Sequence, residues 1–461
     1  MGQACLTPLP RFTTAMAQTD APRFAPFPQG LPHVAYVLLW YPLFTQPFIF
    51  REVEGLRRLL PLSVFSLYGR NLRQCSTEMR AAAGGTYVFG ARRLLLVLGE
   101  ALRQCLLYPR RTWRLFRRSV CRRWQSWETL GENFWAFCVG LYLGRLFQEA
   151  GIDMIYAPWP RGTATAAWVA ASIADLPFAT AARGDNLAPA DPDLGDKLGA
   201  AFFVRANNAA DQARIEAFDQ GQARGKVALV YNSLTLSLPP LAPVQEEEPA
   251  PPGATRPMPR PVRLLALGRF DVTKGFDVLL RACALLRDRG LDFTLTLAGG
   301  GGAVMGLGRM SARISQLRRD LDLEGRVRLP GLVSHNDLPH MLQEHDIFAA
   351  PCIVHASGRR DGIPNTVIEA LAYGLPVVST TVNALPEVVR DGETGLAVPP
   401  GDAPALADAL ARLADDADLA RRLGRAGRRL AEEMFDPERN SRRLADVFIA
   451  QYGAWRRSCA A

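Results

Sequence analysis

The sequence predicts an α/β protein built from two doubly wound, Rossmann-like domains that face each other across a cleft. Three observations support this prediction. The chain has 461 residues, more than one hydrophobic core usually organises. Short apolar runs alternate with helical patterns along it, as in parallel sheets covered by helices. A proline-rich stretch near the middle interrupts this alternation and divides the chain into two halves.

The amino-terminal half has the less regular pattern. Residues 1–32 are polar and rich in proline, and we expect them to form a flexible tail. Residues 33–235 are predicted to form the first domain, which begins with a continuous apolar run of the kind found in buried parallel strands. The predicted strands are 34–40, 62–67, 152–157, 178–180, 200–204 and 226–230, with helices over 48–60 and 163–174.

The proline-rich stretch and the carboxy-terminal half follow. Residues 236–262 contain nine prolines between Pro239 and Pro261, which predicts a semi-rigid linker. Residues 263–435 are predicted to form the second domain, and residues 436–461 a last helix that packs back on the first domain. This helix is expected to begin at Asp436-Pro437, an N-cap followed by proline. The predicted strands are 263–267, 293–298, 327–329, 347–350 and 376–379.

The composition excludes several classes of protein. The eight cysteines include no Cys-x-x-Cys pair, which argues for a reducing compartment and against structural zinc. No signal peptide is recognisable, and the longest apolar segment, 133–144, is shorter than the roughly 20 residues that a membrane-spanning helix needs. The net charge is +9, but no nucleic-acid-binding module accompanies it. We therefore expect a cytoplasmic protein, soluble or peripheral to a membrane, that does not bind nucleic acid.

The segment from Asp361 to Gly401 carries the most specific pattern of the sequence. Pro364 is placed to open a helix, and Gly362 frees the backbone immediately before it. Unpaired N–H groups at such a helix start favour phosphate or a sugar oxygen. Asp361 lies before the helix and Glu369 in its second turn, so the two carboxylates are able to serve different parts of one ligand. From the spacing alone, an N-capping Asp and a solvated Glu are an equally good interpretation.

A second pattern, from Gly268 to Gly275, lies between a predicted strand and a predicted helix. It contains Arg269, whose guanidinium is a planar, forked group of N–H donors, and Lys274, whose ammonium group is a compact point charge. Fixed cations of this kind stabilise a leaving diphosphate when no metal ion does so. The alternative is two surface cations at a helix start. Lys274 is one of only three lysines and follows an apolar strand, which favours the functional interpretation.

The longer string resembles the donor-binding signature of the retaining glycosyltransferases of the group 1 (family four) class, within the GT-B superfamily. The matching residues are Asp361, Glu369, Ala370, Gly374, Pro376-Val377-Val378, Pro386-Glu387, Gly392 and Gly395. The first acid of this signature is usually Glu and here is Asp, a variant that looks like the branch containing colanic acid and other exopolysaccharide transferases. The resemblance is close over 263–435 and loose over 33–235.

The resemblance implies roles for these residues in binding a nucleotide-sugar. Glu369 would hydrogen-bond the ribose, and Asp361 with the segment Gly362, Ile363, Pro364 and Asn365 would hold the sugar hydroxyls. Arg269 and Lys274 would bind the diphosphate, and Gly299 and Gly300 would form a turn near the nucleotide. This glycine run does not repeat the dinucleotide fingerprint Gly-x-Gly-x-x-Gly, so a redox enzyme is disfavoured. No cofactor and no metal are expected.

The amino-terminal domain departs from the family pattern. Relatives often carry a His after the fourth strand, and the corresponding stretch here places Ala182 at that position. Arg183 and Asp185 are the polar groups that remain to line the cleft, and we count them among the candidate catalytic residues. That they only cap and close a loop is equally consistent with the sequence. In the mechanism inferred for retaining relatives, the leaving phosphate itself takes the acceptor proton, so the missing His does not exclude catalysis.

A basic and apolar segment extends from Arg92 to Arg123. It contains ten arginines and one acid, Glu100, interleaved with leucine, phenylalanine and tryptophan. Such a composition is typical of helices that lie on an anionic membrane surface. An ordinary helix with solvated arginines and a buried apolar face is the alternative.

These observations predict a retaining, metal-independent GT-B glycosyltransferase at the inner face of the cytoplasmic membrane. Its donor would be a UDP- or GDP-sugar, and its acceptor a lipid-linked saccharide or oligosaccharide in exopolysaccharide or lipopolysaccharide assembly. Two alternatives stay open: a non-catalytic GT-B scaffold at the membrane and a GT-B sugar-nucleotide epimerase.

Overall fold

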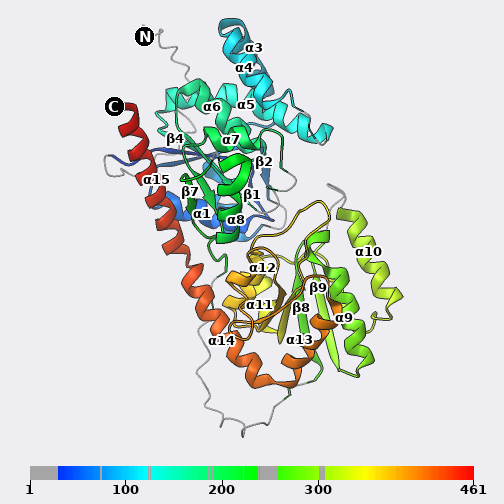
Figure 1. Cartoon of the computed structure of the whole chain (residues 1–461). Helices are drawn as coiled ribbons and strands as arrows, with labels where there is room; N and C mark the ends of the chain where they lie inside the picture. Colours follow the sequence, from blue (N-terminus) through cyan, green and yellow to red (C-terminus); the bar gives the residue numbers. More distant parts are fainter. Residues whose placement is uncertain are drawn as a thin grey trace.

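The computed structural model describes residues 30–72, 75–122, 124, 126–183, 187, 190–221, 223–236, 238, 257–258, 260–300 and 307–460. Within these residues the chain forms two parallel β-sheets with helices on their faces, drawn one above the other in Figure 1. The predicted α/β class with two Rossmann-like domains is therefore confirmed. The tail predicted over 1–32 falls almost wholly outside the described residues.

The amino-terminal sheet has the strand order β3-β2-β1-β4-β5-β6-β7, with every pair of neighbours parallel. Its strands are β1 (Val34–Leu43), β2 (Leu62–Asn71), β3 (Thr86–Val88), β4 (Met154–Ala157), β5 (Phe178–Ala182), β6 (Val204–Ala206) and β7 (Val227–Leu229). Strand β1 pairs on both sides, with Val34 opposite both Leu62 and Met154. This central position explains its continuous apolar run.

Eight α-helices of this domain cover or extend from the sheet in the described part of the chain. They are α1 (Pro47–Arg57), α2 (Thr77–Ala81), α3 (Leu94–Leu107), α4 (Pro109–Ser119), α5 (Trp127–Ala150), α6 (Gly162–Ala174), α7 (Leu194–Ala200) and α8 (Ala209–Ala217). The core helix α5 begins at Ser126, whose Oγ accepts a 3.1 Å hydrogen bond from the Thr129 N–H, and ends at Gly151 in the left-handed conformation.

The carboxy-terminal sheet has the order β10-β9-β8-β11-β12-β13, again with all neighbours parallel. Its strands are β8 (Val262–Leu267), β9 (Phe293–Ala298), β10 (Val327–Arg328), β11 (Ile347–Ala350), β12 (Val377–Thr380) and β13 (Leu396–Val398). The helices that follow are α9 (Phe276–Asp288), α10 (Leu307–Asp320), α11 (Leu338–Gln343), α12 (Asn365–Ala372), α13 (Ala403–Asp415), α14 (Ala417–Met434) and α15 (Pro437–Ala460).

The chain passes between the domains twice, and the two passages touch. The Leu234 N–H, after β7, donates a 2.8 Å hydrogen bond to the Phe435 carbonyl at the end of α14. Asp436 then caps α15, accepting from the Arg439 N–H at 2.6 Å. Helix α15, red in Figure 1, runs back along the amino-terminal domain, where the Phe448 ring lies 5.0 Å from that of Tyr156.

Three details of the secondary structure differ from the sequence prediction. The strand predicted over 200–204 is wrong, because Ala200 ends α7 and β6 begins only at Val204. Strands β3 and β13 were not predicted, since three residues are too few to show a period. Strand β8 begins at Val262, one residue inside the predicted linker.

No helix in the described part of the chain combines the length and apolarity needed to cross a bilayer. The apolar segment 133–144 lies within α5, where Phe137, Leu141 and Leu143 are buried in the core of the amino-terminal domain.

Candidate functional site

A cavity of about 570 Å³ lies between the two domains, at the carboxyl ends of strands from both sheets. On the amino-terminal side it is lined by the loop after β1 and by residues that follow β4, β5 and β6, among them Trp159, Arg183 and Asn207. On the other side it is lined by Arg269, Lys274 and the stretch from Asp361 to Glu369. Doubly wound sheets bind ligands at this position, so the cavity is the candidate site.

The loop between β8 and α9 is held in one conformation by its own side chains. Asp271 Oδ1 accepts hydrogen bonds from the Thr273 N–H at 3.0 Å and from Thr273 Oγ1 at 2.9 Å. Gly275 has φ +64°, and a Cβ atom there would lie 1.9 Å from the Pro351 carbonyl oxygen. Only glycine fits this position, and the resulting turn aims Lys274 into the cavity.

Lys274 and Asp361 form an ion pair in the cavity wall. The Lys274 Nζ atom lies 3.1 Å from Asp361 Oδ2, and their side chains are 12% and 21% exposed. Burial lowers the pKa of Lys274, but the charge and hydrogen bond of Asp361, together with the nearby Cys352, make the net shift upward. Lys274 is therefore positively charged at any physiological pH. Arg269 lies in the same wall.

The loop before α12 contains Asp361 and positions it near the amino terminus of this helix. Asn383 Nδ2 donates to the Asp361 carbonyl oxygen at 3.0 Å and fixes the loop. Pro364 is the N-cap of α12 rather than its first residue, with ψ 135°. Gly362, Ile363, Pro364 and Asn365 all line the cavity, as the sequence motif predicts for residues of one site.

Glu369 lies one turn further along α12 and is 3% exposed. Its Oε1 atom accepts a 2.5 Å hydrogen bond from Thr235 Oγ1, on the segment that leaves the amino-terminal domain. Burial raises the pKa of Glu369 to about 7, although the Thr235 hydrogen bond opposes the shift. The two carboxylates of the motif thus face different neighbours: Asp361 contacts a cation and Glu369 a neutral hydroxyl.

The glycine turn after β9 lies beside the β8 loop. Gly299 has φ +148°, and a Cβ atom there would lie 1.8 Å from the Gly268 carbonyl oxygen. The Gly300 carbonyl accepts a 3.2 Å hydrogen bond from the Phe270 N–H. The turn therefore packs backbone against backbone at the base of the cavity, where Gly299 is part of the lining.

On the amino-terminal wall, the two residues at the end of β5 have different surroundings. Ala182 is the last residue of β5, is fully buried in the core and does not reach the cavity. The side chain that reaches the cavity is that of the next residue, Arg183. Asp185, the other candidate catalytic residue of this wall, lies outside the described residues.

Several contacts between the domains involve residues to which the sequence analysis gave no role. Glu387 accepts hydrogen bonds from the Ala209 and Ala210 N–H groups, both at 3.1 Å, and from Tyr231 Oη at 2.7 Å. It thereby caps α8 of the other domain. Its place in the Pro386-Glu387 motif was the one sequence signal that singled it out. His335 Nε2 lies 2.7 Å from the Phe44 carbonyl oxygen, across the cavity mouth, and no motif marked it.

Across the described residues, no group of three or more His, Cys, Asp or Glu side chains is arranged to hold a metal ion.

Part of the chain matches a known protein family. Residues 261–416 match the family model described as glycosyl transferases group 1. This range contains every candidate site residue of the carboxy-terminal domain and none from the amino-terminal wall.

Two curated relatives are similar over part of the chain. The amylovoran biosynthesis glycosyltransferase AmsK of Erwinia amylovora is 34% identical over 189 residues, 41% of this chain and 44% of that protein. The putative colanic acid biosynthesis glycosyltransferase WcaL of Escherichia coli (strain K12) is 32% identical over 204 residues, 42% of this chain and 48% of that protein. The chain thus matches a little under half of the length of each.

Solved structures extend the similarity of fold to both domains. Anabaena HepE in complex with UDP-glucose superposes with a TM-score of 0.63 at 18% identity, over 90% of this chain and 98% of that chain. Sucrose-phosphate synthase from Thermosynechococcus elongatus gives a TM-score of 0.62 at 19% identity, over 92% and 100%. The chain therefore has the GT-B fold, and its residues 261–416 are similar to the glycosyl transferases group 1 family.

Proposed function

We propose that this protein is a retaining glycosyltransferase that transfers a sugar from a UDP- or GDP-sugar to a lipid-linked saccharide in exopolysaccharide or lipopolysaccharide assembly. The relatives named for amylovoran and colanic acid biosynthesis support this class of product. The retaining outcome is supported by the resemblance of the Asp361-to-Gly401 motif to retaining enzymes.

The observation that carries the proposal is the arrangement of Lys274, Asp361 and Glu369 on one wall of the cavity. Lys274 is charged, largely shielded from water and held by a single ion pair. A diphosphate that enters the cavity meets this ammonium group and the Arg269 guanidinium. Both groups stabilise the negative charge that grows on the leaving diphosphate as the glycosidic bond breaks. In this proposal no metal ion is needed.

The ion pair gives Asp361 a part in the same step. In the free protein the Asp361 carboxylate compensates the buried charge of Lys274. When a diphosphate binds the Lys274 ammonium group, it replaces Asp361 as the counter-ion. The Asp361 carboxylate then becomes available to accept hydrogen bonds from the hydroxyls of the donor sugar. Glu369, with its pKa near 7, is placed to accept from the ribose as it now accepts from Thr235. The leaving phosphate then takes the proton of the acceptor hydroxyl, and the protein supplies charge and orientation.

We further propose that α3 and α4 hold the protein against an anionic membrane surface. These helices, cyan in Figure 1, project from the amino-terminal domain on the side away from the other domain. Leu95 is 84% exposed, Leu106 72% and Trp113 61%. Arg110, Arg114 and Arg117 are exposed beside them on α4. Exposed apolar and cationic side chains on one pair of helices fit a surface that enters the lipid headgroups.

A thermal-shift screen tests the proposed function. The purified protein is heated with UDP, GDP, ADP and their common sugar derivatives in the presence of EDTA. We expect one nucleotide family to raise the melting temperature, and the Lys274→Met variant to lose that shift. No shift with any nucleotide would contradict the donor site, and a shift without transfer to any acceptor would favour the scaffold alternative. Conversion of the donor sugar without any acceptor would identify an epimerase.

A further inference from the structure

We propose that Arg183 and Trp159 form a binding subsite for an oxyanion, a carboxylate or a phosphate group, on the acceptor saccharide. The assignment to the acceptor rests on the proposed function. The subsite itself rests on the geometry of the amino-terminal wall of the cavity, on the side opposite Arg269 and Lys274.

The Arg183 guanidinium lies against two aromatic rings. Its Cζ atom lies 4.2 Å from the ring centroid of Trp159 and 4.9 Å from that of Phe48. All three residues line the cavity. The two rings lie 6.2 Å apart and are inclined by 72° to each other, so they contact the guanidinium from two adjoining sides rather than from opposite faces. Cation–π contact with both rings restricts the orientation of the guanidinium before any ligand arrives.

Several hydrogen-bond donors of Arg183 and Trp159 have no partner among the described residues. Within the described residues, the Nε and Nη2 atoms of Arg183 and the Nε1 atom of Trp159 have no hydrogen-bond partner and an accessible area below 1 Å². Arginine and tryptophan side chains are donors only. The ligand that satisfies them must offer acceptors, and an oxyanion offers the strongest ones.

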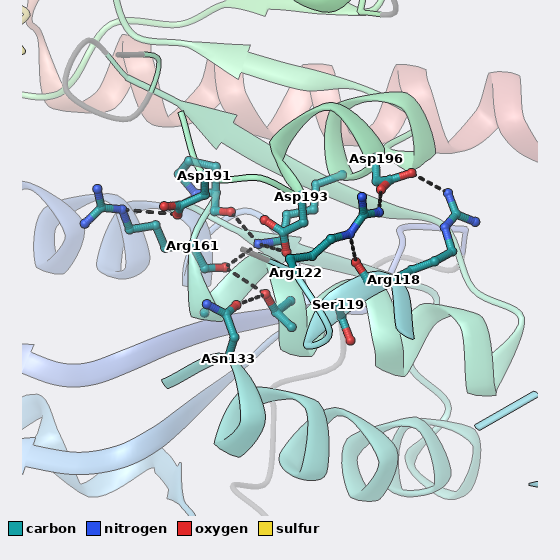
Figure 2. Close-up of polar contacts among 12 residues, drawn as sticks. Arg118, Ser119, Arg122, Asn133, Arg161, Asp191, Asp193 and Asp196 are labelled. Atoms are coloured by element: carbon teal, nitrogen blue, oxygen red, sulfur yellow. Dashed lines mark hydrogen bonds and ion pairs between the residues drawn. The ribbon is translucent and has the colours of Figure 1, made fainter. Parts of the chain in front are cut away.

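The neighbouring charges leave Arg183 without a counter-ion in the described part of the chain. The Arg205 guanidinium and the Glu52 carboxylate form a buried ion pair of their own. Arg161 forms an ion pair with Asp191 (Figure 2), with 3.4 Å between Nε and Oδ2, and Lys197 lies 2.8 Å from Asp193. Glu132 accepts from the Gly162 N–H at 3.2 Å. A buried cation that has no ion-pair partner among the described residues favours binding of an anion from the cavity.

The pKa of Arg183 agrees with this environment. Burial lowers it, and the positive charge of Arg205 lowers it further, while Glu52 opposes both. Burial and the nearby Arg205 therefore make the positive charge of Arg183 unfavourable, and a bound oxyanion relieves that cost.

Binding of three sugar probes tests the subsite. Isothermal titration compares methyl β-D-glucuronide, which carries a carboxylate, and glucose 1-phosphate with the neutral methyl β-D-glucoside, with and without saturating UDP. We expect the wild-type protein to bind at least one anionic probe about tenfold or more tightly than the neutral one, as charge-assisted hydrogen bonds predict. The probe preferred identifies the source of the oxyanion as a uronic acid or a phosphate.

Substitutions test whether Arg183 and Trp159 are responsible for the preference for an anionic probe. Arg183→Gln should abolish it, Arg183→Lys should keep part of it, and Trp159→Phe should weaken it while retaining the stacked ring. Arg422→Gln, an exposed arginine on α14, is the matched control and should bind like the wild type. Circular dichroism and the UDP dissociation constant show that each variant is folded.

The outcomes separate this proposal from the proposed function. Equal binding of all three probes, binding of none, or an unchanged preference in Arg183→Gln would overturn the subsite. A loss of UDP affinity in Arg183→Gln as large as that in Lys274→Met would also overturn it, because Arg183 would then belong to the donor site. If the preference depends on Arg183 but no nucleotide binds, the subsite stands and the transferase proposal fails.

Discussion

Thr235 donates a 2.5 Å hydrogen bond to Glu369, and this contact joins the segment that leaves the first domain to the donor-site helix of the second. The Thr235 carbonyl oxygen also accepts from Arg51 Nε at 3.1 Å, so the same residue is tied to α1. The Glu369 carboxyl group, which the sequence motif assigns to ribose binding, is therefore connected to both domains by these hydrogen bonds.

The raised pKa of Glu369 predicts a pH dependence of stability. A carboxyl whose pKa is higher in the folded than in the unfolded state contributes stability that is complete below its unfolded pKa and lost as the pH rises through the folded value. With a folded pKa of about 7 against 4.5 unfolded, the wild-type protein should lose about 2 kcal/mol relative to Glu369→Gln between pH 5 and pH 8. Melting temperatures of both proteins at the two pH values test this; a constant difference would contradict it.

Replacing Lys274 should show that this residue has a role in turnover that is distinct from its role in stability. Lys274→Met removes the charge proposed to stabilise the leaving diphosphate and should lower the turnover of the nucleotide-sugar by about a hundredfold or more. It also leaves Asp361 in the wall without its cation, so some stability should be lost. The double variant Lys274→Met/Asp361→Asn should recover the melting temperature but not the turnover. Recovery of turnover in the double variant would show that the ion pair is only structural.

The turn at Gly275 should tolerate no side chain. Gly275→Ala places a Cβ atom 1.9 Å from the Pro351 carbonyl oxygen in addition to the strain of a positive φ. We expect a loss of at least about 2 kcal/mol of stability. Gly392→Ala is the matched control, because Gly392 has φ +72° but open space around its Cα, and it should cost about 1 kcal/mol. Chemical denaturation of the two variants measures the difference.

The cap that Glu387 provides to α8 should hold the two domains together. Glu387→Gln removes the negative charge at the α8 amino terminus, and Tyr231→Phe removes the third hydrogen bond of the same carboxylate. Each should lower stability by about 1 kcal/mol. Because both changes affect one cluster, their effects should be less than additive, which a double-mutant cycle measures. Full additivity would show that the two contacts are independent.

The exposed helices α3 and α4 should be required for membrane binding. Leu95→Glu/Leu106→Glu introduces two acids into the exposed apolar surface and should abolish cosedimentation with vesicles containing 30% phosphatidylglycerol. Thermal-shift binding of the nucleotide should stay unchanged, because both positions lie away from the cavity lining. Ile449→Glu, an exposed apolar position on α15, is the control and should not affect vesicle binding. Equal binding of all three proteins would contradict the proposal.

The sequence predicted the part of the site that the carboxy-terminal domain contributes. Arg269 and Lys274 lie in the loop that follows β8, and Asp361 and Glu369 lie in the loop and helix that follow β11. Strand alternation is enough to bring such segments to one edge of a sheet. Their roles remain predictions, because no ligand contact tests them.

The contacts made between domains were not predictable in the same way. The Thr235–Glu369 and Glu387–Tyr231 hydrogen bonds join residues far apart in the chain and depend on how two finished domains dock. Arg183, which the sequence analysis named as a residue that lines the cleft, does line the cavity, immediately after the last residue of β5.

The hydrogen bond between Leu234 and Phe435, where the two passages of the chain meet, has a mechanical consequence. It joins the two backbone passages at one point between the domains. Rotation of the domains about this point requires that the hydrogen bonds of Glu387 with α8 and of His335 with the Phe44 carbonyl oxygen break, because these bonds also join the two domains. A substrate bound to both walls of the cavity adds contacts of the same kind and so holds the two domains in one relative position.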